Sequence, residues 1–182
     1  MARIEPLAEN EVSPSLKAAF QKHVQEYGGR ITNMKATLGH SLLAFEAYMQ
    51  WYPLYAEVEK IIGKRMASLY AHAISFAADC PLCSTFFRKI IIDSGETPDK
   101  PELTESQKNI LDFGSSIAKN KGNIADDLYN TVADSYNKRE MVILTAFAGI
   151  MIATNIFNNV IETEIDEYLV PYKSNNEKLL NK

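Results

Sequence analysis

The chain has 182 residues, 46% of them hydrophobic, and its 19 basic and 23 acidic side chains give a formal net charge of −4. This length suits one domain with a sizeable core, and the lack of any basic patch argues against a nucleic-acid partner. We expect no membrane partner, because the N-terminus does not resemble a signal peptide and the longest apolar run, Met141 to Thr154, is shorter than the roughly 20 residues that span a bilayer. Two cysteines are too few for a disulfide-stapled secreted domain, so we expect a cytoplasmic protein.

The first third of the sequence predicts an arm over residues 1–12 and then two helical stretches. The first stretch begins at Ser13-Pro14, a cap followed by proline, and ends at Gly28-Gly29. We expect a loop through Ile31 to Met34. The second stretch is aromatic and runs from His40-Ser41 toward Ile62, with Pro53 expected to kink or split it.

The rest of the chain predicts further helices, each with a recognisable beginning or end. Capping boxes mark two of these helices, where a polar capping residue is followed three positions later by glutamine or glutamate. The expected elements are a helix over Lys64 to Ala78, one from Pro81 to about Asp93, one from Thr104 (box with Gln107), a short one capped by Asn123, the longest one from Asn137 (box with Glu140), and a closing segment over Asp166 to Tyr172. No segment alternates with a period of two, so no sheet is expected.

Together these elements predict an all-α protein, a compact bundle of about seven to eight helices. One domain is expected over residues 13–172, with a flexible tail over 173–182. Met141 to Ile152 is apolar on all sides, which favours burial within the bundle or in an oligomer.

Both cysteines of the chain lie in the unit Cys80-Pro81-Leu82-Cys83. Pro81 is favoured at the first position of a helix, so Cys80 is expected to cap that helix and Cys83 to occupy its third position. The sulfurs would then be close enough for a disulfide, and the positive end of the helix would lower their pKa values. The alternatives are inert packing and a zinc site, but zinc usually needs four ligands and so would require a second chain.

Several stretches, in their order and spacing over about residues 30–172, resemble the carboxymuconolactone decarboxylase superfamily in its alkylhydroperoxidase D-like (AhpD-like) branch. They are Asn33-Met34 with Leu38-Gly39-His40-Ser41, the apolar helix leading into Cys80-x-x-Cys83, Leu103-Thr104 with Leu111-Asp112-Phe113, Ala153-Thr154-Asn155-x-x-Asn158-Asn159, and Asp166-Glu167-Tyr168-Leu169-x-Pro171-Tyr172. The resemblance implies an all-helical, AhpD-like homo-oligomer (dimer, trimer or hexamer). It also implies a redox-active Cys80–Cys83 disulfide in place of any bound cofactor, a hydroperoxide or small disulfide as substrate, and a partner protein thiol as reductant.

The family's peroxidases also carry a glutamate before the dithiol and a histidine after it, which relay protons. The corresponding positions here are Ser68 and Phe87, and no glutamate occurs from Lys60 to Gly95. Asp79 stands where the family usually has glycine, and its charge should raise the thiol pKa. The sequence therefore predicts weakened peroxidase activity.

Other side chains are candidates to replace the relay or to line a pocket. His72 lies two helical turns before Cys80 and His40 occupies a family-like position, so both are weighed as catalytic residues against structural roles. Arg88 and Lys89 are weighed as thiolate stabilisers against solvated surface charges. His23 is expected to be structural, and Asn155, Asn158 and Asn159 are pocket candidates or partners of a buried helix end.

Three hypotheses follow for the function. The first is a thiol redox enzyme, a peroxidase or a disulfide reductase. The second is a carboxymuconolactone decarboxylase-like enzyme without redox chemistry. The third is a non-catalytic binding or assembly protein that has lost the relay. The aromatic stretch from Phe45 to Tyr55 offers apolar surface that favours an oligomer.

Overall fold

The structure, a computed structural model, describes residues 2–174. Residues 175–182 of the predicted tail lie outside the described part. Within the described part the protein is all-α, with eight α-helices, two short 3₁₀ helices and no strand. The α-helices are α1 (Pro14–Tyr27), α2 (Asn33–Leu38), α3 (Leu42–Met49), α4 (Trp51–Ala77), α5 (Pro81–Asp93), α6 (Glu105–Lys119), α7 (Asp126–Ala133) and α8 (Lys138–Ile161). The 3₁₀ helices are η1 (Glu9–Glu11) and η2 (Glu167–Tyr172).

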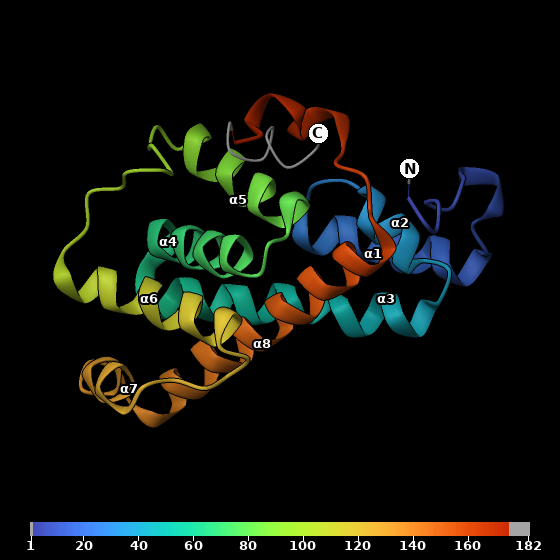
Figure 1. Ribbon diagram of the computed structural model, residues 1–182. Helices are drawn as coiled ribbons and strands as arrows, with labels where there is room; N and C mark the ends of the chain where they lie inside the picture. Colours follow the sequence, from blue (N-terminus) through green and yellow to red (C-terminus); the bar gives the residue numbers. More distant parts are fainter. Residues whose placement is uncertain (1, 175–182) are drawn as a thin grey trace.

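Helix α4 is the centre of the bundle and packs against α5, α6 and α8 (Figure 1). Its buried face and those of its neighbours form the main core, around Tyr70, Phe87, Phe113 and Phe147. A second, smaller core lies among α1, α2 and α3, around Phe20 and its neighbours. The carboxyl end of α8 extends toward α1 and α2 (Figure 1). The dithiol lies in the connection between α4 and α5.

Two glycines shape the central helix and its contacts. Gly63 has φ of 81° and ψ of 154°, so it breaks α4 into two helical segments at a backbone conformation that glycine adopts easily. Gly114 of α6 lies so close to α4 that an added Cβ would come within 2.3 Å of Tyr70 Cε2. That close approach lets the Tyr70 hydroxyl donate a hydrogen bond to the Leu144 carbonyl oxygen of α8.

The capping signals placed most helix boundaries correctly. Ser13 accepts the Leu16 N–H at the start of α1, and Cys80 is the N-cap of α5. The boxes of Thr104 with Gln107 and of Asn137 with Glu140 both form. The starts of α1, α6 and α8 follow from local side-chain hydrogen bonds, and the start of α5 follows from Pro81 at its first position.

Three expectations about the helices were wrong. The residues after Ile31 form helix α2 rather than continuing as a loop. The aromatic stretch divides at Gln50, before Pro53, because the ring of Pro53 fits within the first turn of α4. Asn123 does not cap α7, which begins at Asp126, because the Asn123 side chain donates to the Asn120 carbonyl oxygen instead.

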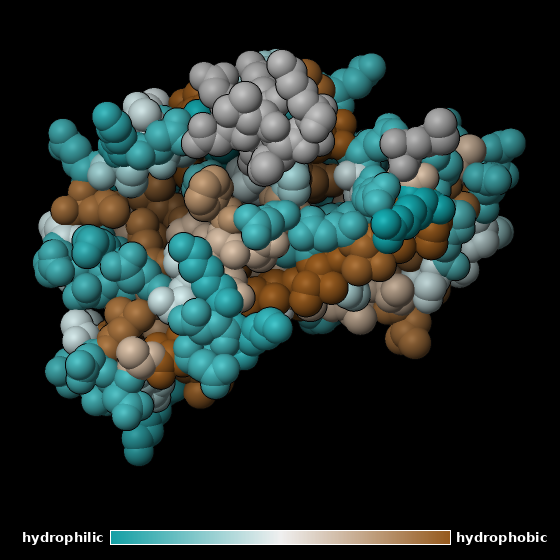
Figure 2. All heavy atoms as spheres, in the orientation of Figure 1, coloured by the Kyte–Doolittle hydropathy of each residue, from teal (hydrophilic) through white to brown (hydrophobic). Residues whose placement is uncertain are grey.

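Helix α8 buries one face and exposes the other. Leu144, Phe147 and Ala148 are completely buried, whereas Val142 and Ile156 are 67% and 56% exposed. The expectation of burial on all sides is therefore wrong for the single chain. Hydrophobic residues follow the line of α8 on the face seen in Figure 2. By length and composition alone α8 would pass as a membrane span, although a core helix of a soluble protein passes the same test.

The aromatic stretch from Phe45 to Tyr55 is not the exposed apolar surface that the sequence suggested. Phe45 is 2% exposed within the smaller core, and Trp51 and Tyr55 stack with ring centroids 4.9 Å apart against the main core. An oligomer would therefore need a different apolar surface, such as the exposed outer face of α8.

Candidate functional site

The dithiol lies at a tight turn between α4 and α5. Asp79 adopts a left-handed conformation with φ of 49°, which reverses the chain after α4. The Cys80 N–H then donates to the Ser75 carbonyl oxygen over 3.1 Å, and Pro81 begins α5. This turn places Cys80 at the cap of α5 and Cys83 at the third helical position, as the sequence predicted.

The two thiols are free, and they form a hydrogen bond with each other. Cys80 is 1% exposed and Cys83 is 5% exposed, with Leu82 and Ile165 packed around them. The sulfurs therefore point toward each other rather than apart. Their arrangement is compatible with reversible disulfide formation as the thiols are oxidised.

The two thiols have different pKa values because they share this hydrogen bond. The bond from Cys83 lowers the pKa of Cys80, and the backbone N–H groups of Cys83 and Leu82 at the helix start lower it further, against the effect of burial. The same pairing and burial raise the pKa of Cys83. The sequence predicted a lowered pKa for both thiols, which the structure contradicts for Cys83. The two thiols titrate as a coupled pair. When the pair carries one negative charge, either sulfur can hold that charge while the other donates the hydrogen bond to it.

Asp79 contributes less to this balance than its charge suggested. Its side chain is exposed to solvent and is not among the groups that shift the Cys80 pKa. Its backbone carbonyl oxygen, by contrast, accepts a hydrogen bond from Asn159. The residue therefore shapes the turn rather than opposing the thiolate.

Two asparagines at the carboxyl end of α8, Asn158 and Asn159, contact the dithiol and the turn that precedes it. The Asn158 amide donates to Cys83 Sγ over 3.2 Å and approaches Met34 Sδ at 3.4 Å. The Asn159 amide donates to the carbonyl oxygens of Ala78 and Asp79, which holds the turn. Asn155 is completely buried, with both side-chain amide atoms unpartnered among the described residues. None of these three asparagines lines the apolar pocket beside Cys83, so they are not pocket residues, although Asn158 contacts the sulfur of Cys83.

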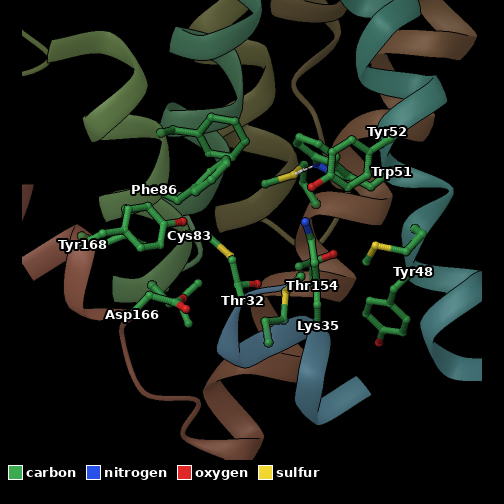
Figure 3. Close-up of a pocket in the computed structure, with 16 residues that line it drawn as sticks. Thr32, Lys35, Tyr48, Trp51, Tyr52, Cys83, Phe86, Thr154, Asp166 and Tyr168 are labelled. Atoms are coloured by element: carbon green, nitrogen blue, oxygen red, sulfur yellow. Dashed lines mark hydrogen bonds between the residues drawn. The ribbon is translucent and has the colours of Figure 1, made fainter. Parts of the chain in front are cut away.

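Cys83, but not Cys80, lies on the wall of a small, partly open apolar pocket of about 70 Å³ (Figure 3). A single buried water needs about 10–15 Å³, so this pocket can admit a small organic group. Aromatic rings and methionines form most of its wall, and Lys35 and Asp166 are its charged residues. The lining residues are Thr32, Met34, Lys35, Tyr48, Met49, Trp51, Tyr52, Leu82, Cys83, Phe86, Phe87, Met151, Thr154, Asp166, Tyr168 and Leu169.

The two histidines weighed as catalytic residues lie outside the lining of this pocket. His72 stacks with Phe76, with ring centroids 6.2 Å apart. The pKa of Asp99 is lowered mainly by its hydrogen bond with Arg88, and the nearby His72 adds a smaller lowering effect. His40 is exposed, and its Nε2 pairs with the Glu5 carbonyl oxygen over 3.0 Å. His23 is buried beside Tyr52 in the smaller core and has no hydrogen-bond partner among the described residues.

The two basic residues of α5 are bound to carboxylates. Arg88 forms a two-fold hydrogen bond with Asp99, at 2.6 and 2.8 Å. Lys89 pairs with Asp93 and lies 5.3 Å from the centre of the Tyr172 ring. Neither residue lines the pocket that holds Cys83. These contacts favour a structural role for Arg88 and Lys89 over a role as thiolate stabilisers.

The positions of the absent relay carry groups without acid–base function. The Ser68 hydroxyl pairs with the Tyr55 hydroxyl over 2.9 Å, and Phe87 is 2% exposed and packs near Trp51. Within residues 2–174 no cluster of three metal-ligating side chains occurs, so the dithiol has no neighbours there that would complete a zinc site.

Sequence reasoning missed Lys35 and Asp166 as pocket residues. Lys35 directly follows the stretch Ile31 to Met34, which the sequence predicted to be a loop, and it carried no expected role. Asp166 was part of the closing segment and carried no expected role. A lysine on the inner side of a short helix gives no signal until the helix itself is recognised.

No family model matches the sequence, and no curated protein matches it. The fold is nonetheless that of AhpD-like helical proteins, so the resemblance found in the sequence is confirmed at the level of the fold. Several solved structures share this fold.

One similar structure is the debrominase Bmp8 in its apo form, with a TM-score of 0.77, 17% identity and coverage of 93% of this chain and 95% of that one. A cysteine-to-alanine variant of the same debrominase, in complex with 2,3,4-tribromopyrrole, also has a TM-score of 0.77 and 17% identity, covering 93% and 94%. An uncharacterised peroxidase-related protein from Silicibacter sp. TM1040 has a TM-score of 0.71 and 13% identity, covering 92% and 93%. An AhpD-core protein from Ralstonia eutropha JMP134 has a TM-score of 0.67 and 14% identity, covering 92% and 94%.

Proposed function

We propose that the protein is a dithiol-dependent reductase that acts on small, largely apolar molecules. The observation that carries the proposal is the position of Cys83, which hydrogen-bonds Cys80 on one side and faces an apolar pocket on the other. A pair of adjacent thiols can deliver two electrons and become a disulfide. The pocket would bring the substrate to Cys83, and Cys80 would then resolve the intermediate.

A hydroperoxide is the first candidate substrate. In the singly deprotonated pair, the proton of Cys83 first moves to the Cys80 thiolate. The resulting Cys83 thiolate attacks the terminal oxygen of the peroxide, the O–O bond breaks, and a sulfenic acid forms on Cys83 while an alkoxide leaves and is protonated. Cys80 then attacks the sulfenic sulfur, which forms the disulfide and releases water. In total, one hydroperoxide and two thiols give one alcohol, one water and one disulfide. A protein thiol partner in the cytoplasm would return the electrons, and a small disulfide could be reduced by the same pair.

The test is a single-turnover reaction of the reduced protein with cumene hydroperoxide, an aromatic hydroperoxide suited to the pocket. The expected result is loss of both thiols and formation of one alcohol for each disulfide. The Cys80→Ser, Cys83→Ser double variant is the control and should consume no peroxide. If the wild-type protein reacts no faster than this control, the peroxidase form of the proposal fails. Unchanged activity of the double variant on an organic acid would instead favour the non-redox enzyme. No turnover, together with a cellular phenotype that the double variant retains, would favour the non-catalytic role.

Reductive dehalogenation is a second candidate, because the pocket beside Cys83 has flat aromatic walls and two of the similar structures are of a debrominase. In such a reaction a carbon–bromine bond is replaced by a carbon–hydrogen bond, the two thiols become a disulfide, and hydrogen bromide leaves. The measurement is bromide release from 2,3,4-tribromopyrrole by the reduced protein. Bromide equal to the disulfide formed would support this candidate, and intact substrate would exclude it for this compound.

A further inference from the structure

The pocket that holds Cys83 has one cationic side chain, that of Lys35 in α2. Lys35 is 5% exposed, so its ammonium group lies inside the protein rather than in solvent. In Figure 3 it reaches into the pocket toward the rings of Trp51 and Tyr52, and its Nζ lies 5.1 Å from the centre of the Tyr52 ring. A buried ammonium group is costly unless it has partners, so its surroundings need to be accounted for.

The protein provides hydrogen-bond partners for only some of the N–H donors of the Lys35 ammonium group. Its Nζ donates to the Arg30 carbonyl oxygen over 3.0 Å. An ammonium group has three N–H donors, so the Tyr52 face and this one oxygen leave it incompletely bonded among the described residues. Asp166, on the same wall, accepts the Asn33 N–H at Oδ1, while its buried Oδ2 has no partner in the described part of the chain. The Lys35 group therefore retains an N–H that can be offered to a bound molecule.

Helix α2 also lies close to the dithiol, through a contact with Asn158. Met34, the neighbour of Lys35, contacts the Asn158 amide that donates to Cys83 Sγ. Lys35 and Cys83 are thus brought to one pocket by α2 and α5, with Asn158 joining the two helices. A molecule that contacts Cys83 in this pocket has Lys35 on the surrounding wall.

We propose that Lys35 is the acid of this site, which donates a proton to the group that leaves when Cys83 attacks its substrate. The proposal rests on the proposed dithiol chemistry and assigns the proton that this chemistry requires. With a hydroperoxide, the alkoxide formed as the O–O bond breaks takes a proton from Lys35 Nζ and departs as an alcohol. Lys35 then regains a proton from water. The residue thereby supplies a function that Ser68 and Phe87 cannot perform at the positions of the absent relay.

The electrostatic surroundings suit this role. Burial lowers the pKa of Lys35 to about 8, and the Asp166 carboxylate opposes that effect. The other titratable groups around it are Tyr52 from α4, Tyr168 from η2 and His23 from α1, whose own pKa is lowered in part by the Lys35 charge. An acid whose pKa lies near the working pH is both protonated and able to release its proton.

The experiment compares two aromatic substrates that differ in the group that leaves. Cumene hydroperoxide expels an alkoxide, a strong base that needs a proton, whereas 3-chloroperbenzoic acid expels a carboxylate, a weak base that does not. Single-turnover rates of thiol loss are measured with both for wild type, Lys35→Met and Lys35→Arg. Methionine has a similar shape without the charge, and arginine keeps the charge but does not release its proton. Lys17→Met, on the exposed face of α1, is the matched control.

The expected result is a loss of about 10²-fold or more in hydroperoxide reduction for Lys35→Met, with peracid reduction changed by only a few-fold. Lys35→Arg should also fail with the hydroperoxide, and Lys17→Met should match wild type. Equal losses with both substrates, or recovery of hydroperoxide reduction by arginine, would overturn the proposal in favour of a structural or charge-anchoring role. If wild type reduces neither substrate, the peroxidase chemistry itself fails, and the assignment of Lys35 with it.

Discussion

Asn158 donates its side-chain N–H to Cys83 Sγ over 3.2 Å, so the last long helix holds the thiol that faces the pocket. The same amide acts to lower the pKa of both thiols, although for Cys83 the pairing with Cys80 and burial prevail. The interaction is a charge-assisted hydrogen bond when the pair carries a thiolate. Its removal should therefore make the thiolate less stable.

Replacement of Asn158 by leucine should slow alkylation of the dithiol by iodoacetamide about tenfold at neutral pH, because a hydrogen bond to a charged group stabilises it by roughly 1.5 kcal/mol or more. The measurement is the alkylation rate of the reduced protein as a function of pH. The pH at which the rate rises should move upward. Asn130→Ala, on the exposed side of α7, is the control and should react like wild type. An unchanged pH profile for Asn158→Leu would show that the amide only fills space.

The two cysteines should have separable roles, because only Cys83 lines the pocket. Cys83→Ser should abolish reaction with cumene hydroperoxide. Cys80→Ser should still react once and should accumulate a sulfenic acid on Cys83, because no second thiol is present to resolve it. A sulfenic-acid-specific reagent followed by mass spectrometry identifies the modified residue. The pKa of Cys80 is the one that is lowered in the pair, so the opposite roles are the alternative to test. A sulfenic acid on Cys80 in the Cys83→Ser variant would show that Cys80 attacks the peroxide and Cys83 resolves the intermediate.

The dithiol was predictable from the sequence because its geometry is local. Proline in Cys80-Pro81-Leu82-Cys83 fixes the start of α5, and a capping residue and the third helical residue always approach each other. The same holds for the capping boxes of α6 and α8. The all-helical fold followed from the same signals together with the absence of alternating segments.

The pocket was not predictable in the same way, because its walls come from distant parts of the chain. Lys35 and Asp166 are brought together only when the segment before η2 packs on α2, through the bond from the Asn33 N–H to Asp166. The raised pKa of Cys83 depends likewise on its partner Cys80 and on burial. Helix periodicity carries no information about which distant side chains share a cavity.

His23 should make the stability of the protein depend on pH. Its pKa is lowered from 6.5 to about 4 by burial and by the nearby Lys35 charge, so the folded protein binds this proton less readily than the unfolded chain. The unfolded chain therefore holds more protons between these two pKa values, and stability increases with pH across that interval. The contribution is complete above about pH 6.5 and is lost as the pH falls toward 4.

The test is thermal unfolding of wild type and His23→Phe between pH 7 and pH 4. Phenylalanine fits the aromatic surroundings of Tyr52 and Phe45 and cannot be protonated. The variant should therefore lose less stability than wild type on acidification, while its melting temperature at pH 7 stays equal or rises because two unpartnered ring nitrogens are removed. Parallel curves for the two proteins would contradict this account.

The outer face of α8 should form contacts between copies of the protein. Val142, Ile156 and Val160 are 67%, 56% and 55% exposed, and Gly149 on the same helix has open space beside it. Exposed apolar residues aligned on one helix favour association with a second copy, whose identical face can pack symmetrically against the first. We therefore expect sedimentation at micromolar concentration to show an oligomer. Ile156→Glu should shift it to monomers, because association would bury the new charge, whereas Gln21→Glu on α1 adds the same charge elsewhere and should leave the oligomer intact. A wild-type monomer, or an oligomer that tolerates glutamate at position 156, would exclude this face as the interface.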